Sequence, residues 1–481
     1  MLKSADGALR DVPFPVNDPE RIPVQRYFDE AFYKAELEHV WPHVWQMACR
    51  LEQIPDVGDW VEYSNVGHSV LIVRTASGVK AYHNACRHRG VPIAGGYGND
   101  AGKVALGNCA KSGFVCPFHG WRWNMDGENT LVYGKHLFSE RQLAEDDINL
   151  VQCRVETWGG CAWINHDDDA PSVRETFGPV AGRLDAHGIG DLKMEWWYGT
   201  VLPANWKVAM EAFMEGYHVM QTHPQLASAR QGALRDMYES DSGLTGDSKE
   251  KSRRNILPDA TTRDTIDAQF RGMERLSEGM AGMVHSKEVE IMRSLLDADL
   301  PEDPMLATAT WFGMVQQKIV DDLRERGEPI PDLNKVAVSD PVNAVEFLFP
   351  HWFVLPVFSS MSSYRIRPLG PESCLFEIWS LTMYPEGADY SPPLEPTMLP
   401  FDSPEFPPIP RQDYSNIPIQ QLGMHAKGFD FMRLSKTHEG MISNYQRILD
   451  GYLAGVPQEK LTKAVNLLGG NFDGPILELG L

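Results

Sequence analysis

Two short segments each pair a cysteine with a histidine, and together they could hold an iron–sulfur cluster. Cys86 and His88 stand in the segment NACRHRG, and Cys116 and His119 stand in CPFHGWRW. A [2Fe–2S] cluster can be bound by two thiolates on one iron and two imidazoles on the other, and the neutral imidazoles raise its reduction potential. The same residues could instead close a tetrahedral zinc site, although structural zinc ligands are usually separated by two to four residues. Only one residue separates Cys86 from His88, so the spacing favours the cluster.

A second group of candidate ligands lies in the segment NWKVAMEAFMEGYHVMQTHP, which ends at Pro224. Glu215 and His218 are three residues apart and would share one face of a helix. On a regular helix, the side chain of His223 would point about 140° away from that of His218. For both imidazoles to reach one metal, the helix must therefore loosen or end between them, and Pro224 favours such an end. Two histidines and one carboxylate on one face of an iron leave neighbouring positions open for dioxygen. Taken alone, the two histidines could equally be a half-buried core residue and a surface residue.

The first two segments resemble the signature of Rieske proteins of the aromatic-ring-hydroxylating oxygenase family, Cys-x-His-Arg-Gly followed by Cys-Pro-x-His-Gly-Trp. Rieske proteins of respiratory complexes are similar but add a disulfide, and Val91 and Phe118 stand where its cysteines would be. The resemblance therefore implies the oxygenase type, with the four residues named above as ligands of the Rieske cluster. Cys109, in the long segment between the two pairs, is interpreted as an ordinary thiol because position 112 is serine and not histidine.

The same resemblance implies a mononuclear iron held by His218, His223 and one aspartate far along the chain. Asp413 matches best, because in RQDYSNIPIQQLG the aspartate is followed by asparagine and then by Gln-x-Gly, as in the family. Other acids in this part of the chain compete with it: Asp402, Glu405 and Asp430.

The resemblance also implies that Glu215 acts in catalysis as a bridge between the Rieske cluster of one subunit and the iron of its neighbour. This role implies a head-to-tail ring of three subunits in which Glu215 hydrogen-bonds a ligand histidine on each side. Aspartate is the more familiar acid here in the family, and glutamate occurs in branches that act on carnitine-like substrates. Ala212 also departs from the pattern, because asparagine is frequent at its position.

The pattern along the chain predicts an α+β protein. Short β-branched runs closed by tight turns indicate an all-β domain over residues 41–166, which the resemblance implies is the Rieske domain, and a charged, Pro-containing stretch follows it. The mononuclear iron domain is expected over residues 167–481, with a helix-grip fold of antiparallel sheet and helices that the resemblance implies. Residues 225–340 are rich in helix formers and are predicted to be a helical insertion. Residues 1–40 are expected to pack on the catalytic domain.

Local patterns within the catalytic domain predict further elements. Residues 207–222 have the apolar spacing of a helix that packs on a core. Residues 363–368 and 374–384 are predicted to be two strands of a hairpin. A Pro-dense loop is expected over residues 396–410, and a helical tail over residues 417–453.

Charge and cysteine content limit the partners and the compartment. The 44 basic and 66 acidic residues give a formal net charge of −22, which argues against nucleic acid as a partner. The beginning of the chain does not resemble a signal peptide, and no apolar run of 18 residues occurs, so no membrane partner is expected. Seven cysteines, an odd number spread over 481 residues, argue against a secreted disulfide framework. A cytoplasmic location is therefore expected.

The resemblance implies an oxygenase alpha subunit that uses dioxygen to hydroxylate a small hydrophobic organic compound. An aromatic or polycyclic compound is favoured, as in the breakdown of aromatic hydrocarbons, and a quaternary amine oxidised by a monooxygenase is the alternative. Mono- and dioxygenation both stay open. Electrons would come from NAD(P)H through a partner ferredoxin or flavin reductase, because the chain has no dinucleotide-binding glycine motif of its own. A homotrimer is expected, with or without a beta subunit. A Rieske electron carrier without mononuclear iron is the other class of protein considered.

Overall fold

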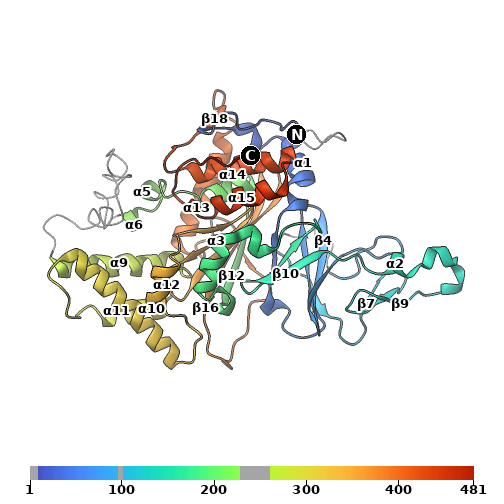
Figure 1. Ribbon diagram of the computed structural model, residues 1–481, viewed down its shortest axis with the longest axis horizontal. Helices are drawn as coiled ribbons and strands as arrows, with labels where there is room; N and C mark the ends of the chain where they lie inside the picture. Colours follow the sequence, from blue (N-terminus) through green and yellow to red (C-terminus); the bar gives the residue numbers. More distant parts are fainter. Residues whose placement is uncertain (1–8, 96–100, 228–260) are drawn as a thin grey trace.

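The computed structural model describes residues 9–95, 101–227 and 261–481. Figure 1 shows a β-rich arm, drawn in blue to teal, that extends from one side of a larger body of sheet and helices. Helices drawn in yellow lie at the opposite end of this body. The predicted α+β class, with a β-rich N-terminal part and a mixed α/β catalytic part, is confirmed.

Three small antiparallel sheets build the β-rich part. Their strands are β2 (Gln46–Arg50), β3 (Asp59–Asn65), β4 (His68–Thr75), β5 (Gly78–His83), β6 (Leu106–Asn108), β7 (Phe114–Val115), β8 (Arg122–Trp123), β9 (Asn129–Leu131), β10 (Arg154–Trp158) and β11 (Cys161–Asn165). The strand orders are β5-β4-β3-β6, β10-β11-β2 and β7-β8-β9. Buried and partly exposed side chains alternate along β3, whereas β4 is buried continuously from Val70 to Val73. A continuous buried run is typical of a strand that is covered on both faces.

A six-stranded sheet with the order β13-β14-β15-β16-β12-β17 forms the catalytic part. Its strands are β12 (Lys193–Leu202), β13 (Glu346–Leu348), β14 (Trp352–Pro356), β15 (Met361–Gly370), β16 (Ser373–Thr382) and β17 (Thr397–Met398). Every pair is antiparallel except β12 with β17. β15 and β16 form the hairpin that the sequence predicted.

Helices from distant parts of the chain pack on this sheet and on one another. They are α3 (Val173–Ala186), α4 (Trp206–Glu211), α5 (Val219–Thr222), α6 (Pro224–Ala227), α13 (Pro408–Gly423), α14 (Gly440–Ala454) and α15 (Gln458–Leu468). The predicted helix over residues 207–222 is wrong in its middle, because α4 ends at Glu211 and α5 begins only at Val219. The predicted helical tail is also interrupted, since the short strand β18 (Phe431–Arg433) separates α13 from α14.

The described part of the predicted insertion is helical. It contains α9 (Thr262–Met280), α10 (Ser286–Ser294), α11 (Pro304–Glu325) and α12 (Leu333–Ser339), the yellow helices of Figure 1. Thr261 and Asp264 form a capping box at the start of α9, and Asp303 caps α11 before its first-turn Pro304. Residues 228–260 of the same prediction lie outside the described residues.

The N-terminal segment lies against the C-terminal helices. Its elements are β1 (Arg21–Pro23), which pairs with β18, and α1 (Glu30–His39), while α2 (Glu145–Ile148) belongs to the β-rich arm. Arg26 is buried and forms an ion pair with Asp450 of α14. Glu36 of α1 pairs with Lys207 of α4 over 2.8 Å, with both side chains buried. One buried and one partly buried ion pair therefore fix the beginning of the chain to α4 and α14, because an unpaired buried charge costs several kcal/mol.

Candidate metal centres

The ligand atoms of His218, His223 and Asp413 lie within 4.8 Å of one another. The Nε2 atom of His223 is 3.1 Å from Oδ1 of Asp413, and the Nε2 atom of His218 is 3.8 Å from the same oxygen. His223 and Asp413 are buried, and His218 is half-buried. Two imidazole nitrogens and a carboxylate oxygen that meet at one point form the donor set of a mononuclear non-haem iron.

The two ends of α5 and the helix α13 place these three residues. α5 follows directly on His218 and ends at Thr222, so His223 has left the helical conformation, with φ −119° and ψ 62°. The predicted end of the helix before His223 is therefore confirmed. Asp413 lies on α13, which begins at Pro408 within the region predicted as a Pro-dense loop. Proline is tolerated in the first turn of a helix because the N–H groups there have no intrahelical partner.

The ring nitrogens that face away from this group are held by neighbouring side chains. His218 Nδ1 lies 2.7 Å from Oε1 of Glu215, and His223 Nδ1 lies 2.8 Å from Oε1 of Gln412. Burial disfavours the charged form of His218, but the hydrogen bond and charge of Glu215 outweigh it and raise its pKa. Such outer hydrogen bonds orient metal-binding imidazoles and leave the Nε2 atoms free for the metal. The residues present thus fit an iron ion.

The competing acids do not reach this group. Asp402, Glu405 and Asp430 are exposed, and none of them belongs to a cluster of potential ligands in the described structure. Asp430 lies outside any helix, between α13 and β18, although the sequence placed it inside the helical tail. Gln412 was not predicted as a site residue, and its position directly before Asp413 is the signal that could have found it.

The two Cys-His segments fold into matching turns. Backbone N–H of Gly90 donates to the carbonyl of Cys86 over 2.8 Å, and that of Gly120 donates to the carbonyl of Cys116 over 3.0 Å. Both glycines have positive φ, +75° and +72°, which other residues rarely adopt. In both loops the backbone N–H of the cysteine donates to a carbonyl five residues further along the chain. Cys86 donates to the carbonyl of Val91, and Cys116 donates to that of Trp121.

The matching turns bring the two histidines together. The ring centroids of His88 and His119 are 4.6 Å apart, and His88 stacks on Trp121. The Nδ1 atoms of both rings are buried and have no hydrogen-bond partner in the described structure. Cys86 and Cys116 are also buried, and burial raises the pKa of Cys86. A [2Fe–2S] cluster explains the orphaned nitrogens, so the residues present fit a Rieske cluster.

Cys109 lies in the same hydrophobic cluster as Cys86 and Cys116, and burial raises the pKa of its thiol to about 11. A neutral buried thiol is consistent with the interpretation of Cys109 as an ordinary core cysteine. All seven cysteines are free within the described residues, so no disulfide joins the loops at Val91 and Phe118.

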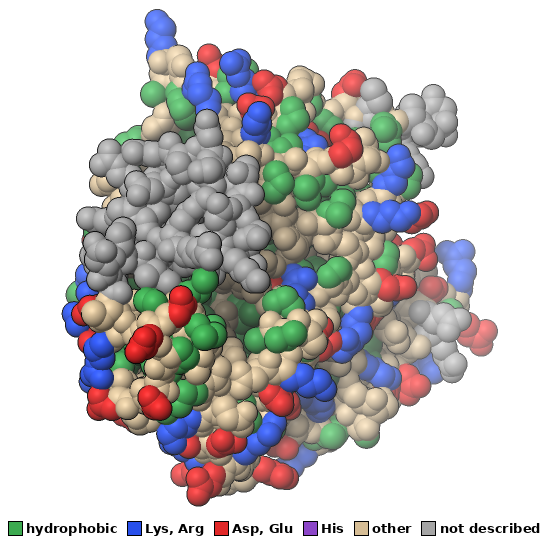
Figure 2. Space-filling view, turned by 60° about the vertical axis from the view of Figure 1, so that its left-hand side comes forward, with side chains coloured by type: hydrophobic (Ala, Val, Ile, Leu, Met, Phe, Trp, Pro, Cys, Tyr) green, Lys and Arg blue, Asp and Glu red, His purple; other side chains and the backbone are tan. Residues whose placement is uncertain are grey.

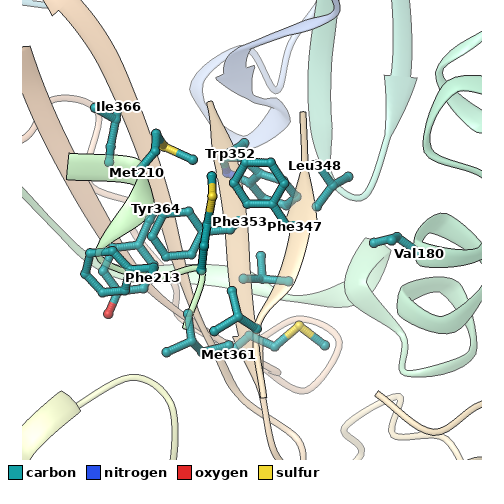
Figure 3. Packing of buried hydrophobic residues seen from close by; sticks show 14 of the residues in the cluster. Val180, Met210, Phe213, Phe347, Leu348, Trp352, Phe353, Met361, Tyr364 and Ile366 are labelled. Atoms are coloured by element: carbon teal, nitrogen blue, oxygen red, sulfur yellow. The ribbon is translucent and has the colours of Figure 1, made fainter. Parts of the chain in front are cut away.

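A row of aromatic rings leads away from Asp413. Tyr414 packs on Phe376 with ring centroids 4.9 Å apart, and Tyr364 lies between Phe376 and Phe213 at 5.9 and 5.2 Å. Figure 3 shows Phe213, Phe353 and Tyr364 turned toward one another. Burial and then the negative charge of Asp413 raise the pKa of Tyr364.

Comparison with known proteins identifies the family. The model of the ring hydroxylating alpha subunit (catalytic domain) matches residues 183–455, and the model of the Rieske [2Fe-2S] domain matches residues 44–135. The chain belongs to the ring-hydroxylating oxygenase alpha-subunit family, as the sequence motifs indicated. Membership in this family implies a Rieske cluster and a mononuclear iron that reacts with dioxygen. No helix in the described part of the chain is long and apolar enough to cross a membrane.

Individual relatives match parts of the chain. The carnitine monooxygenase oxygenase subunit of Escherichia coli (strain K12) is 29% identical over 213 residues, which are 44% of this chain and 54% of the relative. The biphenyl 2,3-dioxygenase subunit alpha of Rhodococcus jostii (strain RHA1) is 32% identical over 209 residues, 42% of this chain and 43% of the relative. The chain thus spans about half the length of the curated relatives that it matches.

One solved structure shows the same fold over most of the chain. The quaternary ammonium Rieske monooxygenase CntA in complex with L-carnitine aligns with a TM-score of 0.55 at 17% identity, covering 92% of this chain and 99% of that one.

Proposed function

We propose that this chain is the oxygenase component of a Rieske non-haem iron system that hydroxylates a small organic compound with dioxygen. The convergence of His218, His223 and Asp413 carries this proposal, because an electron carrier needs no such site. The match to the catalytic domain over residues 183–455 supports it.

We assign the Rieske cluster to Cys86, His88, Cys116 and His119, and the mononuclear iron to His218, His223 and Asp413. When bound, the cluster supplies single electrons and the iron supplies a site for dioxygen. Gln412 holds the ring of His223, so that its Nε2 faces the metal position.

Glu215 is our candidate for a bridge between subunits. One of its oxygens accepts from the ring of His218, and its side chain is 11% exposed. We propose that it reaches a Rieske ligand histidine of a neighbouring chain in a ring of three, and that electrons pass between subunits there. A separate ferredoxin or flavin reductase would reduce the cluster.

The aromatic row beside Asp413 supports a hydrophobic substrate, because such rings exclude water and pack on apolar carbon. The hydroxyl of Tyr414 is buried without a hydrogen-bond partner in the described structure and could orient a polar atom of the substrate. On the face that carries the helical insertion, Figure 2 shows hydrophobic side chains gathered around a hollow among interspersed acidic and basic ones. This surface suits the entry of an apolar compound, and an aromatic or polycyclic ring system is the first candidate.

A quaternary amine is the second candidate. The carnitine monooxygenase among the relatives and the presence of glutamate at position 215 favour it. The same row of aromatic rings could enclose a trimethylammonium group through cation–π contacts.

Turnover with isotopically labelled dioxygen separates these candidates. The protein is supplied with a reductase, NADH and either naphthalene or carnitine. Mass spectrometry then measures how many labelled oxygen atoms each product contains. One labelled oxygen atom per product indicates a monooxygenase, and two indicate a dioxygenase. Naphthalene turnover alone supports the first candidate, and carnitine turnover alone replaces it by the second. Loss of turnover in His223→Ala ties the reaction to the proposed iron.

A further inference from the structure

A third group of potential metal ligands lies in the β-rich part of the chain and shares no residue with either iron site. The ligand atoms of His83, Cys153 and His166 are within 4.8 Å of one another. Cys153 is buried and the two histidines are half-buried, so the thiol lies at the bottom of the cluster. His68 lies at its rim, with its ring centroid 4.8 Å from that of His166.

Backbone hydrogen bonds hold the three ligand segments in place. His83 is the last residue of β5, Cys153 directly precedes β10, and His166 directly follows β11. The backbone N–H of His83 donates to the carbonyl of Val151, and that of Cys153 donates to the carbonyl of Ala81, both over 2.9 Å. The cluster therefore lies where two sheets are joined by backbone hydrogen bonds, and such regular elements can hold metal ligands in fixed positions.

The three histidines have no carboxylate partner of their own in the described structure. None of His68, His83 and His166 forms an ion pair there, although the charge of exposed Asp168 acts on His83. Burial and the neighbouring histidines lower the pKa of His166 to about 4, so its ring is neutral near pH 7. A neutral imidazole has a free lone pair for a metal.

We propose that His83, Cys153 and His166 bind a divalent transition-metal ion such as Zn²⁺, with His68 as the fourth ligand. One thiolate and three imidazoles are a donor set that zinc accepts in tetrahedral geometry. Bond lengths of about 2.3 Å to sulfur and 2.0 Å to nitrogen require a sulfur–nitrogen separation of about 3.5 Å. The Sγ atom of Cys153 is 3.9 Å from Nδ1 of His166, so a shift of a few tenths of an ångström closes this pair.

The thiol needs a change of protonation for this role. Burial raises the pKa of Cys153 to about 12, and its Sγ donates to the carbonyl of Asn165 over 3.5 Å. Metal binding would displace this proton to solvent and form the metal–sulfur bond in its place.

Zinc binding to the iron-loaded protein tests the proposal. The protein is mixed with excess zinc sulfate, freed of loose metal by gel filtration, and examined for metal content and by X-ray absorption at the zinc edge. We expect one zinc per chain with one sulfur neighbour and several nitrogen neighbours, and an unchanged iron content. The single sulfur identifies the site, because the proposed mononuclear site offers no sulfur and the Rieske ligands offer two.

Variants assign the ligands. Cys153→Ser should remove the sulfur neighbour, and His166→Gln, a change at a half-exposed position, should weaken zinc binding by at least about tenfold. The exposed His136 serves as the matched control, and His136→Gln should bind zinc like the parent. The proposal fails if the iron-loaded protein retains no zinc, if the sulfur neighbour persists in Cys153→Ser, or if zinc enters only as iron leaves. None of these readouts depends on oxygenase activity.

Discussion

At the scale of single residues, the contacts around the candidate iron site distinguish residues that orient a ligand side chain from residues that would bind the iron. Gln412 holds His223 by one hydrogen bond of 2.8 Å and also contacts Gln225. Glu211 lies four residues before Glu215, but it is buried and accepts hydrogen bonds from the hydroxyl of Tyr27. The two glutamates of this segment therefore have different tasks, one at the metal site and one in the core.

Replacing Gln412 with leucine should weaken iron binding. The change removes the hydrogen bond that fixes the ring of His223, and loss of such outer contacts typically lowers metal affinity by about 10- to 100-fold. Competition with a chelator measures the affinity. Gln420→Leu, at an exposed position of the same helix, is the control and should bind iron like the parent. Equal affinity in both variants would show that Gln412 does not position the ligand.

Replacing Glu211 with glutamine should change the pH dependence of stability. Burial raises the pKa of Glu211 to about 7 from an ordinary value of 4.5. The folded state therefore holds this proton more tightly, and wild-type stability falls as the pH rises from about 4.5 to 7. The glutamine variant lacks this loss, so its free energy of unfolding should rise relative to wild type across that window, by on the order of 3 kcal/mol. Urea unfolding at several pH values measures it, and parallel curves for the two proteins would contradict the assignment.

At the scale of elements, turns and helix ends decide where the ligands point. The two Cys-His loops were predictable because their glycines and spacings are characteristic, and the β15–β16 hairpin was predictable from its strand pattern. The break between α4 and α5 was not, because residues 207–222 contain only one glycine and no proline. The position of Asp413 on a helix was also missed, since Pro408 and Pro410 suggested a loop although both fit the first turn of α13. Tertiary packing overrides the local pattern in the first case, whereas in the second the prolines themselves are compatible with a helix start.

The positive φ of Gly120 should make its loop sensitive to substitution. A Cβ added there meets no atom within 4 Å, so Gly120→Ala tests backbone conformation alone. The substitution should lower the free energy of unfolding by about 1 to 2 kcal/mol. The visible absorption of the cluster should therefore bleach faster on addition of urea. Gly190→Ala is the control, because this glycine also has open space but an ordinary φ. Identical bleaching in both variants would mean that the turn does not support the cluster.

At the scale of the whole molecule, cluster and iron ligands belong to different parts of the chain. The cluster ligands lie in the arm of Figure 1, and the iron ligands lie in the body, at the two ends of α5 and on α13. The proposed ring of three subunits would bring the cluster of one chain beside the iron of its neighbour. Neither the subunit contacts nor the substrate can be predicted from one chain, because both depend on surfaces that the fold presents to other molecules.

Replacing Glu215 with glutamine should stop electron transfer and leave both metal sites filled. The amide cannot carry the negative charge that the proposed bridge places between two ligand histidines. The reduced cluster should then reoxidise at least about 100-fold more slowly with substrate and dioxygen, at unchanged iron content. Stopped-flow absorption follows the cluster, and Glu215→Asp, which keeps the charge, should restore part of the rate. Normal reoxidation in Glu215→Gln would exclude this route.

The metal content and visible spectrum of the purified protein test the two iron sites most directly. We predict a red-brown protein with about three irons per chain. Cys86→Ala should lose the colour, His223→Ala should keep the colour and lose one iron, and His136→Gln should lose neither. Two irons that His223→Ala does not change would indicate an electron carrier. A colourless protein with zinc at the four Cys-His residues would contradict the account.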